Sequence, residues 1–175
     1  VEINRLIVNK EKTVAIPFHL IQNKNTDLPI ISYQETPINY VKETKFLGIW
    51  LDKHLNWRKH TEILAVRLSK ICFALRSIEK VTGINSMRTL YYSCFNSLIT
   101  YGVIFWGNST GSQLIFKLQK IIMEANKRTS CRPLFKKLQI LPLPCIYILE
   151  TLVFIQTHLT SFKTNNTYTH ITIGS

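Results

Sequence analysis

The stretch KFLGIWLDKHLNW, residues 45–57, decides how the chain is organised. Its first half is rich in strand-forming aromatic and branched residues on both sides of Gly48. Its second half contains Asp52 and Asn56, whose short polar side chains favour turns and helix starts. The stretch therefore predicts a strand over 45–51 that bulges or meets another backbone at Gly48 and leads directly into a helix.

A long helix is predicted from Trp57 to Lys80, with Gly83 ending it. Its apolar residues recur at steps of three and four, which is the pattern of one buried face: Trp57, Leu64, Leu68, Ile71, Leu75 and Ile78. The remaining arc carries six cations: Arg58, Lys59, Arg67, Lys70, Arg76 and Lys80. These cations form either a solvated face or a surface that a partner covers. The second interpretation is favoured by the apolar residues among them, Ile63, Val66 and Phe73, and by only two opposing acids, Glu62 and Glu79.

Short strands are expected before this helix and further helices after it. The strand segments are 3–8, 12–18, 30–33, 38–41 and 45–51. A second helix should begin after an N-cap at Asn85 or Ser86 and turn one face inward: Met87, Tyr91, Cys94, Leu98, Tyr101 and Phe105. A third should start near Ser109 and bury Leu114, Leu118, Ile121 and Ala125. A basic segment at 126–138 and a last helix at 144–159 follow, then a polar tail at 161–175.

The net charge of +12 is concentrated after the strands. Residues 1–52 hold 6 basic and 6 acidic residues, whereas residues 53–175 hold 16 basic and 4 acidic ones. Such an excess favours nucleic acid as the partner. Two weakly charged runs, 89–116 and 138–162, are read as buried helices and not as membrane spans, and without a visible signal peptide we expect an intracellular protein, in the nucleus or the cytoplasm.

No metal site is expected in this chain. The four cysteines are widely spaced, and the five histidines show no ligand spacing. Trp57 and His60, three positions apart, are interpreted as a packed tryptophan beside a surface histidine.

Four stretches in order resemble the reverse transcriptases of non-LTR, jockey-like retrotransposons, downstream of the catalytic core. LIVNKEKTVAIPF resembles the polymerase motif D region, and KFLGIWLDKHLNWRKH resembles motif E, the primer-grip hairpin, entering the thumb. YYSCFNSLITYGVIFWGNS and SCRPLFKKLQILPL resemble the helical region beyond. Together they span roughly residues 5 to 155. The resemblance implies an α+β fold, in which a small antiparallel sheet precedes a helical thumb bundle.

The resemblance also implies roles for particular segments. Residues 1–52 would be a palm remnant, residues 53–160 a thumb-like domain and residues 161–175 a flexible tail. Phe46, Leu47 and Gly48 would form the primer grip, and the six cations of the long helix would contact template–primer phosphates. Lys12 would lie near the phosphates of the incoming nucleotide; a solvated lysine in a polar turn is the equal alternative.

Two catalytic metal ions about 4 Å apart require paired carboxylates. The only two aspartates of this chain, Asp27 and Asp52, lie 25 residues apart. We therefore expect no catalytic residue here, no polymerisation by this chain alone, and Mg²⁺ only in the complete polymerase. Since the chain starts with Val1 inside an apolar run, the missing N-terminal polymerase portion is expected upstream. Two alternatives remain open: an independent basic helical module that binds nucleic acid, and a non-functional product of a decayed element.

Overall fold

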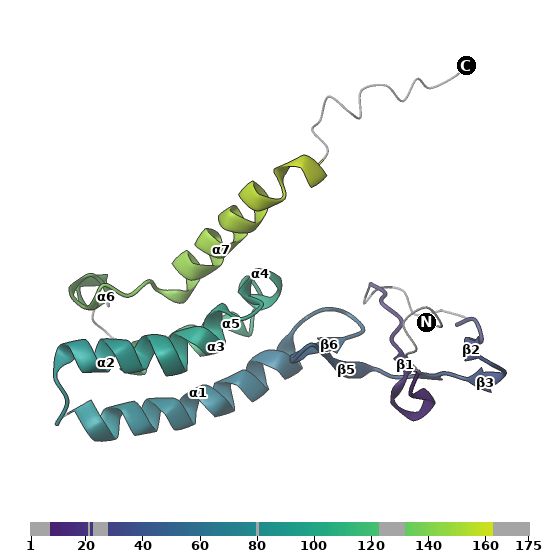
Figure 1. The fold of residues 1–175 in the computed structure, drawn as a ribbon, viewed down its shortest axis with the longest axis horizontal. Helices are drawn as coiled ribbons and strands as arrows, with labels where there is room; N and C mark the ends of the chain where they lie inside the picture. The colour runs from purple at the N-terminus through teal and green to yellow at the C-terminus, as the bar shows by residue number, and fades with distance from the viewer. Residues whose placement is uncertain (1–7, 21, 23–27, 80, 123–131, 163–175) are drawn as a thin grey trace, which may run out of the picture.

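The computed structural model describes residues 8–20, 22, 28–79, 81–122 and 132–162. Short strands occupy one end of the molecule, and helices make up the rest (Figure 1). The predicted α+β class is confirmed.

The strands form three separate pairs within the described residues, instead of one sheet. β1 (Val14–Ala15) runs parallel to β4 (Asn39–Tyr40), β2 (Ser32–Tyr33) is antiparallel to β3 (Thr36–Pro37), and β5 (Glu43–Phe46) is antiparallel to β6 (Ile49–Asp52). Strands are thus confirmed inside 12–18, 30–33 and 38–41, but they are shorter than expected. Most of the predicted strand 3–8 lies outside the described residues.

The start predicted for the strand 12–18 is wrong, because a 3-10 turn, η2 (Lys10–Lys12), precedes β1. Asn9 caps this turn: its Oδ1 accepts a hydrogen bond from the Lys12 backbone N–H at 3.1 Å. An asparagine side chain that binds the backbone three residues later competes with extended structure, so the strand begins only at Val14.

The hairpin that the resemblance implies is present, but segment 45–51, predicted as one of its strands, contains its two-residue turn at Leu47 and Gly48. Phe46 pairs with Ile49, and both turn residues have positive φ, +45° and +84°. Turns of this kind match the twist of the flanking strands, and the second position suits glycine because it has no Cβ. Gly48 therefore reverses the chain and does not mark a bulge.

The long helix is confirmed as α1 (Arg58–Glu79). Its predicted stripe packs inward: Leu64, Leu68 and Leu75 are buried, whereas Val66 and Phe73, placed outside the stripe, are 60% and 76% exposed. The stripe ends before Ile78, which is 36% exposed.

The second predicted helix is four short elements: α2 (Ile84–Leu90), a π-helix η3 (Tyr91–Asn96), α3 (Ser97–Thr100) and α4 (Val103–Trp106). Its N-cap is Gly83 and not Asn85 or Ser86. The predicted face is partly wrong, because Cys94, Tyr101 and Phe105 are exposed. The buried face is Tyr91, Phe95, Ile99, Val103 and Trp106. The wider π turn shifts the phase of the side chains by part of a turn, and Gly102, with φ +62°, restarts the helix in a new direction.

Three further helices complete the bundle: α5 (Ser112–Ile122), α6 (Arg132–Leu138) and α7 (Leu143–Thr157), followed by a 3-10 turn, η4 (Leu159–Ser161). The inward face of α5 is rotated by one residue from the prediction: Ile115, Gln119 and Ile122 are buried, whereas Leu114 and Ile121 are exposed. Ala125 and most of the tail lie outside the described residues, and the helix α6 lies within the segment read only as basic.

Gln119 explains the rotation of α5. Its side-chain amide is fully buried and donates hydrogen bonds to the Tyr91 hydroxyl at 2.7 Å and to the Leu141 carbonyl at 2.8 Å. Its Oε1 accepts a hydrogen bond from the Leu143 N–H at 2.8 Å. One polar side chain thus joins α5 to η3 and to the start of α7.

Helix α7 begins inside the bundle and then projects from it (Figure 1). Leu143 and Ile146 near its start are buried, but from Leu152 onward every described residue is exposed. None of the helices among the described residues combines the length and the apolar character needed to cross a membrane.

Candidate nucleic-acid interface

Asp52 forms the joint between the β5–β6 hairpin and α1. Its Oδ1 accepts hydrogen bonds from the N–H groups of His54 at 3.0 Å and Asn56 at 3.3 Å, and its Oδ2 accepts one from Trp57 at 3.1 Å. The Asn56 side chain in turn accepts from the Arg58 N–H at 3.1 Å. The Asp52 contacts satisfy backbone donors of the turn that precedes α1, and the Asn56 contact satisfies a donor that the first helical turn leaves unpaired. They confirm the turn and helix-start chemistry predicted for these two residues.

The tip of the hairpin is held against the junction of α3 and α4. The Tyr101 hydroxyl donates a hydrogen bond to the Leu47 carbonyl. A Cβ added to Gly48 would lie 3.4 Å from the Tyr101 ring, and one added to Gly102 would lie only 2.5 Å from the Ile49 side chain. The close approach expected at Gly48 is therefore made to the Tyr101 side chain, which lies 53 residues further along the chain.

Phe46 and Leu47 keep their side chains in solvent although their backbone is fixed. Phe46 is 61% exposed and Leu47 is 74% exposed. Two apolar side chains on an anchored turn offer a small, pre-positioned contact surface. The three residues predicted for the primer grip all lie at the tip of the hairpin.

Two of the six predicted cations form ion pairs within the chain. Arg58 pairs with Glu62 one helical turn away, with a nitrogen–oxygen distance of 2.9 Å. Lys59 pairs with Glu43 of β5 at 3.2 Å, and its Nζ lies 5.6 Å from the centre of the Trp50 ring. Lys59 therefore ties α1 to the hairpin.

Arg67, Lys70 and Arg76 remain exposed on α1. Among the side chains that the structure describes, no carboxylate lies within ion-pair distance of these three. Val66 and Phe73 are exposed on the same helix. We call these five residues the α1 basic face. Lys80 lies outside the described residues.

Lys12 is separated from the α1 basic face. It is exposed in η2, beyond β1, and the β5–β6 hairpin lies between this turn and α1 (Figure 1). The structure does not unite Lys12 with the other predicted site residues.

His60 is buried, and the prediction of a surface histidine is wrong. Its side chain is 7% exposed, and its ring centre lies 5.8 Å from that of Trp106. Burial lowers the pKa of this imidazole from its ordinary value, because the charged form loses its hydration. Sequence reasoning missed this contact because Trp106 lies 46 positions away.

The described residues do not fit the two catalytic Mg²⁺ ions of a polymerase. Both oxygens of Asp52 accept backbone hydrogen bonds at the joint, and Asp27 lies outside the described residues. Within the described ranges, no group of three or more His, Cys, Asp or Glu side chains is placed to hold a metal ion.

The comparisons with known proteins point to mobile elements. The chain is similar to the retrovirus-related Pol polyprotein from type-1 retrotransposable element R1 of Bradysia coprophila, at 27% identity over 124 residues. The alignment covers 67% of this chain and 12% of that protein, so the chain spans about an eighth of the relative's length. No family model matches, and no solved structure gives a significant match. The chain is therefore related in sequence to a protein of non-LTR retrotransposons.

Proposed function

We propose that this chain is the palm–thumb border and thumb of a non-LTR reverse transcriptase. The observation that carries the proposal is the coupling of two surfaces through Asp52: an anchored hairpin tip with exposed Phe46 and Leu47, and the α1 basic face. In this proposal the tip contacts the primer end, and the basic face contacts the phosphates of the template–primer duplex.

The geometry of α1 suits a duplex. Arg67 and Arg76 lie nine residues apart, which is about 14 Å along a helix. Over that length a duplex presents about eight phosphates on its two strands. Because cations that contact phosphates carry no base information, such a face would bind duplexes of any sequence.

Polymerisation in this proposal requires a further portion of the polymerase that carries the metal-binding carboxylates. The R1 relative is about eight times longer than the matched segment, which leaves room for such a portion outside it. Lys12 would approach the nucleotide phosphates only in that complete assembly. This chain contributes positioning and duplex binding, with no chemical step of its own.

The salt dependence of duplex binding tests the α1 basic face. With three phosphate contacts, the logarithm of the association constant should fall against the logarithm of the salt concentration with a slope of about −3. The Arg67→Ala/Lys70→Ala variant should flatten this slope by about 2. Binding of a labelled RNA–DNA hybrid at several salt concentrations gives the slope. All sequences should weaken alike.

The matched control is Lys10→Ala/Lys42→Ala, which removes the same charge from exposed positions on the strand region. It should leave the slope within about 0.5 of the wild-type value, since neither lysine then contacts a phosphate. An equal flattening in both double variants, each with unchanged circular dichroism, would show that α1 acts only through net charge, and the proposal would fail.

A further inference from the structure

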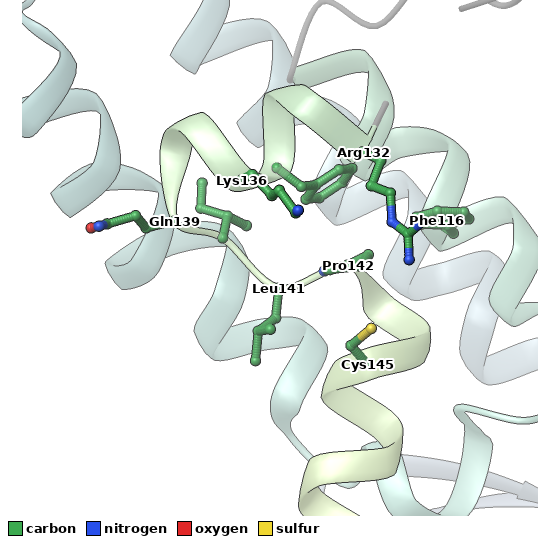
Figure 2. Close-up of a pocket in the computed structure, with 9 residues that line it drawn as sticks. Phe116, Arg132, Lys136, Gln139, Leu141, Pro142 and Cys145 are labelled. Atoms are coloured by element: carbon green, nitrogen blue, oxygen red, sulfur yellow. The ribbon is translucent and has the colours of Figure 1, made fainter. Parts of the chain in front are cut away.

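A cavity of about 560 Å³ lies between α5, α6 and the first turn of α7 (Figure 2). Its apolar walls include Phe116, Phe135 and Pro142, and its charged groups are Arg132 and Lys136. The volume falls within the range of small-molecule sites. None of the functions proposed above uses this cavity.

The walls combine aromatic rings with positive charge. The Phe116 and Phe135 ring centres are 6.4 Å apart, and Arg132 and Lys136 supply the positive charge. Lys136 is exposed and lines the cavity (Figure 2). The described lining includes no carboxylate. These walls would suit an anion that also has an apolar, flat part.

We propose that this cavity binds one nucleotide of a single-stranded nucleic acid. The base lies against the apolar walls formed by Phe116 and Pro142, and its phosphate lies at Lys136. Aromatic stacking combined with a nearby cation is the general way in which proteins hold single strands without sequence preference.

Other anions fit the cavity less well. An acidic peptide would leave the aromatic wall without a flat partner, and a small inorganic anion would leave it in contact with water. A duplex keeps its bases stacked inside, so it cannot place one here. The cavity is thus distinct from the α1 basic face in both position and ligand, and it does not depend on the function proposed for that face.

The cysteines provide a site-specific test in the unmodified chain. Cys145 is exposed and lines the cavity, Cys94 is exposed on η3, and Cys72 is buried. An oligothymidylate of about eight nucleotides should slow alkylation of Cys145 about tenfold at ten times its dissociation constant. Alkylation of Cys94 should keep its rate. Mass spectrometry of the peptides measures both rates in the same sample.

Three comparisons make the test specific. The Lys136→Ala variant should need a higher oligothymidylate concentration for the same protection, whereas Lys42→Ala, which removes one charge from an exposed position on the strand region, should behave as wild type. An abasic oligomer and polyglutamate should protect weakly. The proposal is overturned if Cys145 is unprotected in the wild-type chain, if Cys94 is protected equally, or if the abasic oligomer or polyglutamate protects as well as oligothymidylate.

Discussion

His60 combines a titratable ring with a buried position. Within the described part of the chain its Nε2 has no hydrogen-bond partner, and burial lowers its pKa. The unfolded chain, with a pKa near 6.5, therefore takes up a proton that the folded chain resists. The contribution of His60 is fully present above pH 6.5, and it is lost as the pH falls from 6.5 through the folded-state pKa.

We expect the His60→Phe variant to lose less stability than wild type between about pH 7.5 and pH 5.5. Phenylalanine keeps an aromatic ring beside Trp106 and binds no proton. Urea unfolding followed by circular dichroism measures the difference. His158→Phe, at an exposed histidine, should retain the wild-type pH dependence. A parallel loss of stability in all three proteins would contradict the assignment to His60.

At the scale of the element, the hydrogen bonds of Gln119 fix the orientation of α5 more specifically than its apolar contacts do. We expect Gln119→Leu to lower the free energy of unfolding by at least about 2 kcal/mol, because the Tyr91 hydroxyl, the Leu141 carbonyl and the Leu143 N–H lose their partner. Gln113→Leu, at an exposed position of the same helix, should change it by less than about 0.5 kcal/mol. Denaturant unfolding compares the two, and equal effects would refute the role of Gln119.

Three helices show where the sequence predicted the buried face correctly and where it did not. The face of α1 was predictable because an uninterrupted period follows a local cap at Asp52. The face of α5 was missed because a buried glutamine breaks the apolar pattern, and its three partners are distant in sequence. The prediction for the second helix was wrong for another reason: no local sequence signal indicates the π-helix at Tyr91–Asn96.

Part of the candidate site was also predictable. The tip residues Phe46, Leu47 and Gly48 and the six cations could be chosen from the resemblance and the helical period. Among the described side chains, Arg58 and Lys59 are paired and Arg67 and Lys70 are not, which depends on where Glu62 and Glu43 lie in three dimensions. The cavity beside α6 was invisible in sequence, because its walls come from α5, α6 and α7.

At the scale of the whole molecule, the projecting part of α7 and the η4 turn after it expose several large apolar side chains. Leu152 and Leu159 are 58% and 65% exposed, and Phe154 and Phe162 beside them are also exposed. Contiguous apolar surface of this kind promotes association in water. We expect the isolated chain to self-associate as its concentration rises.

The variant Leu152→Gln/Leu159→Gln should shift the chain toward the monomer, since glutamine preserves helix propensity while removing the apolar contacts. Ile30→Gln/Val81→Gln changes two apolar residues that are 92% and 85% exposed elsewhere, and it should not alter the association. Sedimentation velocity at several concentrations measures the difference. A wild-type chain that stays monomeric throughout would contradict this expectation.

The hydrogen bond from Tyr101 to Leu47 also has a consequence for the order of folding. The hairpin turn is local and can close within microseconds, but the contact that fixes its tip joins residues 54 positions apart. Closing so long a loop costs chain entropy that is recovered only when the helices from α1 to α4 pack together. We therefore expect the tip to reach its final position late in folding, so that a nascent chain ending before Tyr101 would carry a formed hairpin without a fixed tip.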